Sequence, residues 1–239
     1  MLSTLLLAGL ASGISAPGDT VAARDITLGA GEVVHVWSSG TGAPVVLVPG
    51  LFGSAFGYRK LVGPLEARGY RVIIVEPLGT GTSAYPKDAD YSLTAQADRI
   101  ASVLDTLGVR HALLVAHSVG VSMALRLTYR RPELVRGLLA IDGGPVEEAA
   151  TPGLRHAMKF TLFLKLFMGQ STLRKKVRHA MIENSGDTTW ITDSVVQGYT
   201  AGPARDLHRT IDALHGMAKS REPALLRDHL DEIHVPVRL

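Results

Sequence analysis

A serine at position 118 lies in a pattern typical of an enzymatic nucleophile. Residues 115–120 read VAHSVG and stand between an apolar run and a stretch with helical spacing. A serine hydroxyl attacks a carbonyl carbon when a base takes its proton and the backbone fixes its direction. A sharp strand-to-helix turn fixes that direction, and its crowding favours small residues two positions either side, here Ala116 and Gly120. The alternative interpretation is that Ser118 only caps the following helix.

Two glycine-containing loops precede this motif. Residues 48–54 (VPGLFGS) follow one apolar run, and a loop there could offer the backbone N–H of Leu51 to an oxyanion, opposite the N–H of Val119. Residues 75–83 (VEPLGTGTS) follow the next apolar run. That second loop lacks the Gly-Lys-Ser/Thr ending of a phosphate loop, and no helix opens on its last glycine, so it predicts no nucleotide site.

The elements around these motifs alternate between strand and helix patterns. A hairpin is expected over residues 27–37, buried strands at 45–48, 72–75, 112–115 and 138–141, and helices at 58–68, 93–107 and 119–130. Wholly apolar short runs are typical of strands covered on both faces. The pattern therefore predicts an α/β fold with a mostly parallel sheet and helices on both faces.

The alternation stops after residue 145. Helical stretches are expected at 154–168, 173–182 and 207–217, with turns at 169, 185–187 and 202–203, and strand character returns only at 234–237. We therefore predict a leader over 1–23, an α/β core over 24–145, a helical lid inserted over 146–232, and a return to the sheet at 233–239.

In combination, these motifs resemble the α/β-hydrolase superfamily. Pro-Gly follows one strand, E-P-x-G-x-G-x-S the next and A-H-S-x-G the third, and residues 131–138 (RPELVRGL) are similar to the family's lead into the following strand. The resemblance covers residues 24–145 and the strand near His234. It implies a serine hydrolase, esterase- or lipase-like, with Ser118 as nucleophile and the N–H groups of Leu51 and Val119 as the oxyanion hole. The family usually has histidine at Pro49 and aspartate at Glu76, and neither position performs the chemistry.

The family pattern also places the other two members of a catalytic triad. The acid commonly follows the strand that begins here at His234, and the histidine follows the strand after that. The resemblance therefore implies that the final strands and helix, with the acid and the histidine, lie beyond Leu239. Asp142 is an alternative orienting acid, and its other interpretation is a turn cap. We expect His117 to point into the fold and pack there rather than act as a base.

Composition narrows the remaining choices. The 239 residues carry a formal charge of +3 and no cysteine, which excludes disulfides, thiolate metal sites and a cysteine nucleophile. Basic residues form no long run with interleaved aromatics, so we predict no nucleic-acid partner, and neither a cofactor nor a metal ion. The uncharged, leucine-rich residues 1–16 are typical of a signal peptide without its positive region, which predicts a secreted or periplasmic protein, with a cytoplasmic one as the alternative.

The apolar residues 160–168 of the expected lid bear on the substrate. If they line the site, they favour a small-molecule partner with an apolar ester group, and the alternative is that they pack on one another as a lid core. Contact with a membrane surface is the less favoured reading of the nearby basic residues. Two function classes remain, a serine hydrolase and a non-catalytic binding protein with the same fold. The oligomeric state is not predicted.

Overall fold

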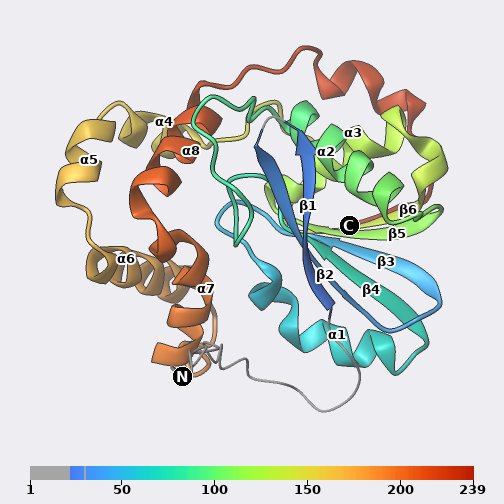
Figure 1. Cartoon of the computed structure of the whole chain (residues 1–239), viewed down its shortest axis with the longest axis horizontal. Helices are drawn as coiled ribbons and strands as arrows, with labels where there is room; N and C mark the ends of the chain where they lie inside the picture. The colour runs from blue at the N-terminus through green and yellow to red at the C-terminus, as the bar shows by residue number, and fades with distance from the viewer. Residues whose placement is uncertain (1–21, 30) are drawn as a thin grey trace, which may run out of the picture.

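The computed structural model describes residues 22–29 and 31–239, so the expected signal peptide lies outside the described part. One sheet holds the described strands in the order β1-β2-β4-β3-β5-β6-β7 (Figure 1). Their bounds are β1 (Ala22–Gly29), β2 (Glu32–Ser39), β3 (Ala43–Val48), β4 (Tyr70–Val75), β5 (Ala112–His117), β6 (Val135–Ile141) and β7 (Val237–Arg238). The hairpin β1–β2 is antiparallel, β2 is antiparallel to β4, and the remaining pairs are parallel. The predicted α/β class with a mostly parallel sheet is confirmed.

Alternate residues of the central strands face opposite layers. Val45 and Leu47 of β3 pack with Tyr58 in a cluster that includes side chains of α1 (Arg59–Glu66), which follows the short helix η1 (Ala55–Tyr58). Val46 and Val48 face the larger cluster, to which α2 (Leu93–Thr106) and α3 (Val119–Arg130) contribute. Because both faces are covered, the strands can be apolar along their whole length. Figure 1 shows α1 on one side of the sheet and α2 with α3 on the other.

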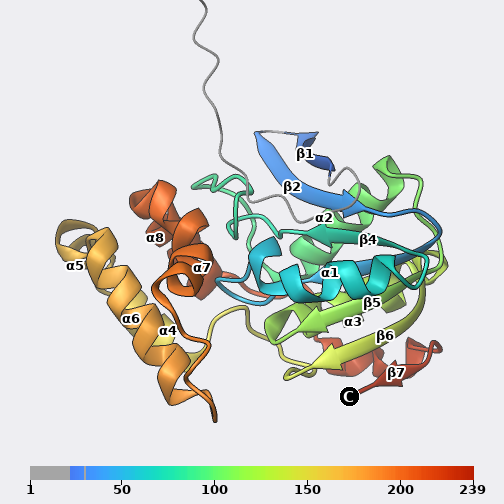
Figure 2. The ribbon, with the colours of Figure 1, turned by 90° about the horizontal axis from the view of Figure 1, so that it is seen from below.

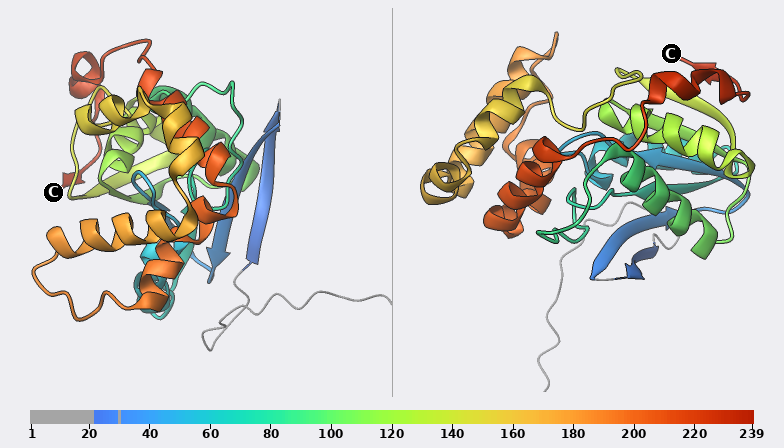
Figure 3. Two further views of the ribbon diagram at one scale, coloured as in Figure 1. Left: turned by 90° about the vertical axis from the view of Figure 1, so that its left-hand side faces the viewer. Right: turned by 90° about the horizontal axis from the view of Figure 1, so that it is seen from above.

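The segment after β6 is helical. It contains α4 (Pro152–Met158), α5 (Thr161–Phe167), α6 (Gln170–Glu183), α7 (Asp193–Arg205) and α8 (Leu207–Lys219). Figures 2 and 3 show these helices grouped beside the sheet rather than on either of its faces. The predicted helix over 154–168 is wrong as one element, because the chain breaks between α4 and α5 at residues 159–160.

Helix α7 was not predicted, since Gly202 and Pro203 indicated a turn and instead lie inside the helix. Packing explains this outcome. A Cβ added to Gly202 would lie 2.1 Å from the Gly81 carbonyl oxygen, so the helix presses on the 79–83 loop where only glycine fits. The carbonyl of Pro203 accepts a hydrogen bond from the Thr210 hydroxyl at 3.1 Å, which ties α7 to α8. Tertiary contacts therefore outweigh the local helix-breaking tendency.

The chain returns to the sheet through η3 (Leu226–Glu232) and the two-residue strand β7, which is shorter than predicted and begins later. Val237 of β7 pairs with Leu138 of β6 in parallel register. Among the residues the structure describes, no helix is both long and apolar enough to span a bilayer.

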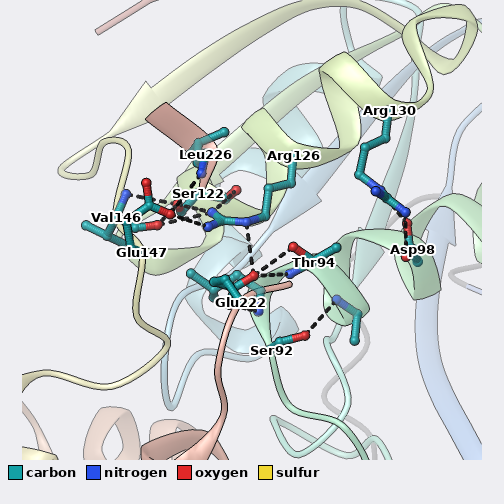
Figure 4. Close-up of polar contacts among 12 residues, drawn as sticks. Ser92, Thr94, Asp98, Ser122, Arg126, Arg130, Val146, Glu147, Glu222 and Leu226 are labelled. Atoms are coloured by element: carbon teal, nitrogen blue, oxygen red, sulfur yellow. Dashed lines mark hydrogen bonds and ion pairs between the residues drawn. The ribbon is translucent and has the colours of Figure 1, made fainter. Parts of the chain in front are cut away.

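A buried arginine joins the two ends of the helical segment to the core (Figure 4). Arg126 of α3 is fully buried, and its guanidinium lies 2.9 Å from Glu147, just after β6, and 3.2 Å from Glu222, just after α8. Glu222 also accepts hydrogen bonds from the N–H groups of Leu93 and Thr94 at the start of α2. The carboxylates thus receive several donors each, as buried charges require.

Candidate active site

Ser118 occupies a strained position between β5 and α3. Its backbone angles are φ 52° and ψ −129°, a combination that non-glycine residues rarely adopt and that costs about 1–3 kcal/mol. Its N–H donates to the Ile141 carbonyl at 3.0 Å, and its carbonyl accepts from the N–H of Val121 at 3.0 Å. Its side chain makes no capping hydrogen bond to α3, so the interpretation of Ser118 as an ordinary helix cap is wrong.

Close contacts around this turn explain its small residues. A Cβ added to Gly120 would lie 2.7 Å from the Pro49 carbonyl oxygen, and one added to Gly50 would lie 2.8 Å from Cβ of Ser118. A Cβ on Gly143 would lie 2.3 Å from the Ser118 carbonyl oxygen. All three distances are too short for a real side chain. Loops after β3 and β6 therefore meet at Ser118, as parallel strands that end at one edge of a sheet allow.

The two predicted oxyanion donors lie in this crowded region. Val119 is the first residue of α3, where a backbone N–H has no partner within its helix. Leu51 follows Gly50 in the loop that touches Ser118, and this loop is closed by a 2.9 Å hydrogen bond from the Gly53 N–H to the Gly50 carbonyl. Within residues 22–29 and 31–239, neither the Leu51 nor the Val119 N–H donates a hydrogen bond, so both remain available to a ligand.

Glu76 has a role that the sequence did not reveal. Its side chain is 1% exposed and accepts hydrogen bonds from the N–H of Ala55 at 2.7 Å, the N–H of Thr82 at 2.5 Å and the Thr82 hydroxyl at 2.9 Å. Ala55 directly follows the loop that carries Leu51, so the carboxylate joins that loop to the 79–83 loop. Gly81 makes room for it, since an added Cβ would lie 2.1 Å from a Glu76 oxygen.

A cavity of about 420 Å³ lies between the Leu51 loop and the helical segment. Its walls come from the 49–54 loop, from η1 and α1, from the ends of β5 and β6, and from α6, α7 and the segment between them. The side chains are mostly apolar and include Leu51, Phe52, Tyr58, Leu61, His117, Ile141, Leu173, Val177, Met181, Trp190, Tyr199 and Pro203. Such a lining suits an apolar ligand group.

This lining corrects two expectations. The residues expected to line a lid site, 160–168, contribute nothing to the cavity, whose helical walls are α6 and α7. His117 was expected to pack inside the fold, yet it is exposed and lines the cavity. His117 is the last residue of β5, and side chains along a strand point alternately to its two faces. Ala116 faces the larger core cluster, so His117 points to the opposite face of the sheet, at a position that α1 does not cover.

The remaining polar candidates form no complete triad among the described residues. Asp142 is exposed with φ 47°, and its side chain makes no hydrogen bond within the described part of the chain. The Ser118 hydroxyl likewise makes no hydrogen bond to a histidine or a carboxylate there. Tyr58 lines the cavity, but burial raises the pKa of its phenol, so it keeps its proton and donates to the Val48 carbonyl at 2.9 Å.

Comparisons with known proteins agree with this architecture. A model of the α/β hydrolase fold family matches residues 43–184. The chain is 36% identical over 131 residues to a 2-hydroxymuconate semialdehyde hydrolase of Pseudomonas sp. strain CF600, covering 53% of this chain and 46% of that protein. It is 31% identical over 144 residues to an sn-1-specific diacylglycerol lipase of Mus musculus, covering 60% and 44%. The matched part thus spans about half the length of these relatives.

Solved structures show the same fold at lower identity. An α/β hydrolase fold protein from Burkholderia ambifaria superposes with a TM-score of 0.73 at 23% identity, covering 90% of this chain and 78% of that one. An epoxide hydrolase superposes with a TM-score of 0.71 at 18% identity, covering 91% and 81%. The coverage includes most of the helical segment, so that segment is part of the shared architecture.

Proposed function

Because this chain belongs to the family of proteins with the α/β hydrolase fold, we propose that it acts as a hydrolase with Ser118 as its nucleophile. The observation that carries the proposal is the backbone of Ser118, held at φ 52° with no capping bond to α3. A serine that only begins a helix does not need this strained backbone. In a nucleophile, the strained turn raises the serine hydroxyl clear of the strand, where a substrate can reach it. Strain of this kind is concentrated at functional sites.

In the proposed reaction, the Ser118 oxygen attacks the carbonyl carbon of an ester or amide. The serine proton passes to a base, which the family pattern assigns to a histidine that follows the nucleophile and the acid in chain order. Charge develops on the carbonyl oxygen, where the N–H groups of Leu51 and Val119 would stabilise it. The alcohol or amine leaves with a proton, and water then cleaves the acyl-enzyme to release the acid and regenerate Ser118.

The cavity supports a small substrate with an apolar group. Ser118 is not one of its lining residues, but His117 before it in the chain and Gly50, whose added Cβ would lie 2.8 Å from Cβ of Ser118, both line the cavity. Its walls are mostly hydrocarbon and aromatic, and its described polar lining is sparse, which disfavours sugars and nucleotides. The relatives named as a 2-hydroxymuconate semialdehyde hydrolase and a diacylglycerol lipase act on different molecules, so their names do not identify the substrate of this chain. The proposal is therefore an esterase-like activity on small apolar esters.

A fluorophosphonate probe and an alanine variant test the proposal together. The probe should label Ser118, and Ser118→Ala should lose the label and about three orders of magnitude in turnover of p-nitrophenyl esters. Ser102→Ala, at an exposed serine of α2, is the matched control for loss of a hydroxyl. A Ser118→Ala variant that keeps wild-type turnover would refute the assignment, as would labelling at another serine.

His117 needs a separate test because it lines the same cavity. His117→Gln should keep most of the turnover if the base is another histidine. A loss of turnover as large as that of Ser118→Ala would indicate that His117 is the base. The base would then not be the histidine that the family pattern indicates.

A further inference from the structure

Helix α5 presents an apolar face that no described part of the chain covers. The exposed fractions of its large side chains, together with Phe160 just before it, run from 57% for Phe160 to 73% for Leu162, with Phe163, Leu166 and Phe167 in between. Among the residues of α5, only Leu164 packs against the core. The expectation that these residues form a lid core packed on itself is therefore wrong for most of them. An exposed group of this size is typical of an interaction site.

The position of this face sets it apart from the cavity beside Ser118. Helix α5 lies at the outer edge of the helical segment, on the side away from the sheet (Figures 1 and 2). The cavity is lined by α6 and α7 and by none of the α5 residues. The exposed face can thus bind a partner without blocking the candidate active site, and its role is independent of the proposed function.

The stretch of sequence that contains α5 carries charges of one sign only. Residues 151–182 contain no aspartate or glutamate, and their cationic residues are Arg155, Lys159, Lys165, Arg174, Lys175, Lys176 and Arg178. Arg155, Lys165 and Arg178 pair with carboxylates from outside this segment. Among the described residues, Lys159 just before α5, and the cluster at 174–176 just after it, have no acidic partner within 4.0 Å.

From this combination we propose that α5 binds the surface of a lipid bilayer that carries anionic headgroups. Phenylalanine and leucine side chains on one helix face enter the boundary between headgroups and acyl chains, and nearby cations are attracted to the phosphates. A second copy of this chain is a poorer partner, because a symmetric contact would bring two groups of unpaired cations together. The phenylalanine and leucine side chains on this face cannot form hydrogen bonds. Binding at the boundary between lipid headgroups and acyl chains does not need such bonds.

Vesicle co-sedimentation tests the proposal without any need for enzymatic activity. The chain should bind vesicles of phosphatidylcholine mixed with phosphatidylglycerol, bind phosphatidylcholine alone far more weakly, and release as salt is raised. Replacing Arg174, Lys175 and Lys176 together by glutamine should weaken binding to the anionic vesicles roughly 100-fold, at about one kilocalorie per charge. Replacing Lys60 and Lys87, exposed cations of the α/β core, by glutamine is the matched control and should change binding little.

The apolar face has its own variant. Leu162→Ser combined with Phe163→Ser and Phe167→Ser should weaken vesicle binding about tenfold or more, with melting little changed because these side chains are exposed. Leu230→Ser in η3 is the control for loss of an exposed leucine. Binding that persists in the triple serine variant would place the lipid contact elsewhere, for example in the leucines of residues 5–10, and would overturn the proposal. The wild type could instead fail to bind vesicles and form a dimer that the triple variant abolishes. That result would make this face a contact between two copies of the chain and would also overturn the proposal.

Discussion

The carboxylate of Glu76 accepts a hydrogen bond at 2.7 Å from the N–H of Ala55, the residue that follows the loop carrying Leu51. A buried carboxylate thereby fixes the end of the loop whose start touches Ser118. Oxyanion stabilisation depends on donors that are already in place before charge develops. If the proposed oxyanion hole operates, the position of Glu76 therefore affects catalysis, although its side chain bonds only to groups of two loops.

Glu76→Gln should lower turnover more than substrate binding. The amide keeps the shape of the carboxylate but has one acceptor oxygen, so either Ala55 or Thr82 faces an NH₂ group. We expect kcat for p-nitrophenyl esters to fall about tenfold or more, with KM changed less, because a displaced oxyanion donor acts mainly in the transition state. Glu133→Gln, at an exposed carboxylate, is the control. Unchanged kcat in a folded Glu76→Gln protein would show that the loop keeps its position without the carboxylate.

Alanine at the glycines around Ser118 should destabilise the fold. At Gly50 and Gly120 a methyl group would lie 2.8 Å from Ser118 Cβ and 2.7 Å from the Pro49 carbonyl oxygen, so the loops must move apart, which costs about 1–3 kcal/mol. Gly153 in α4 provides the control, since nothing lies within 4 Å of its added Cβ, and Gly153→Ala should be neutral or stabilising. Denaturant unfolding of the three variants measures the difference. Equal effects at all three positions would argue against the crowded turn.

Substrate length should respond to α6 and not to α5. Met181→Trp adds bulk to the cavity wall and should shift the preference among p-nitrophenyl esters toward shorter acyl chains. Leu162→Trp adds similar bulk on the exposed face of α5 and should leave the preference as it is. The relative kcat/KM across a series of chain lengths measures both. A shift caused by Leu162→Trp instead would restore the idea that residues 160–168 line the substrate site.

Arg126→Met should be strongly destabilising. It leaves the carboxylates of Glu147 and Glu222 without their shared cation, and loss of one partner of a buried ion pair costs about 3–5 kcal/mol. Arg130 lies on the same helix as Arg126 and forms a half-exposed ion pair with Asp98 of α2, so Arg130→Met should cost at most about 1 kcal/mol. Thermal unfolding distinguishes the two. Similar melting points for both variants would mean that the buried network contributes little.

Protonation of Glu147 should lower the stability of the protein at acid pH. Burial alone would raise the pKa of its carboxyl, but N–H donors from Leu226 and Arg227, together with Arg126, hold that pKa below its usual value. A carboxyl with a lowered folded-state pKa contributes stability above the ordinary glutamate pKa, and this contribution is lost as pH falls toward the lowered value. The free energy of unfolding should therefore decrease over that range, and less steeply in Glu147→Gln. Parallel pH profiles for the two proteins would contradict this account.

Local pattern was sufficient for the α/β core. Apolar runs at 45–48, 72–75 and 112–115 became β3, β4 and β5, because a strand covered on both faces needs apolar residues at every position. The motif at 115–120 correctly predicted the turn between β5 and α3. The small residues that this turn needs lie within two positions of Ser118, so the sequence shows them directly. These features depend on neighbours along the sequence, and the sequence displays such neighbours directly.

Contacts between distant segments decided the rest. Gly202 lies in a helix because α7 packs on Gly81, His117 faces a cavity because β5 ends where α1 no longer covers it, and Glu76 holds Ala55 across the space between two loops. The apolar residues of α5 are exposed although their composition equally suits a packed core. Side-chain composition determines what a segment can bury, and only the arrangement of the other segments in space determines whether anything is there to cover it.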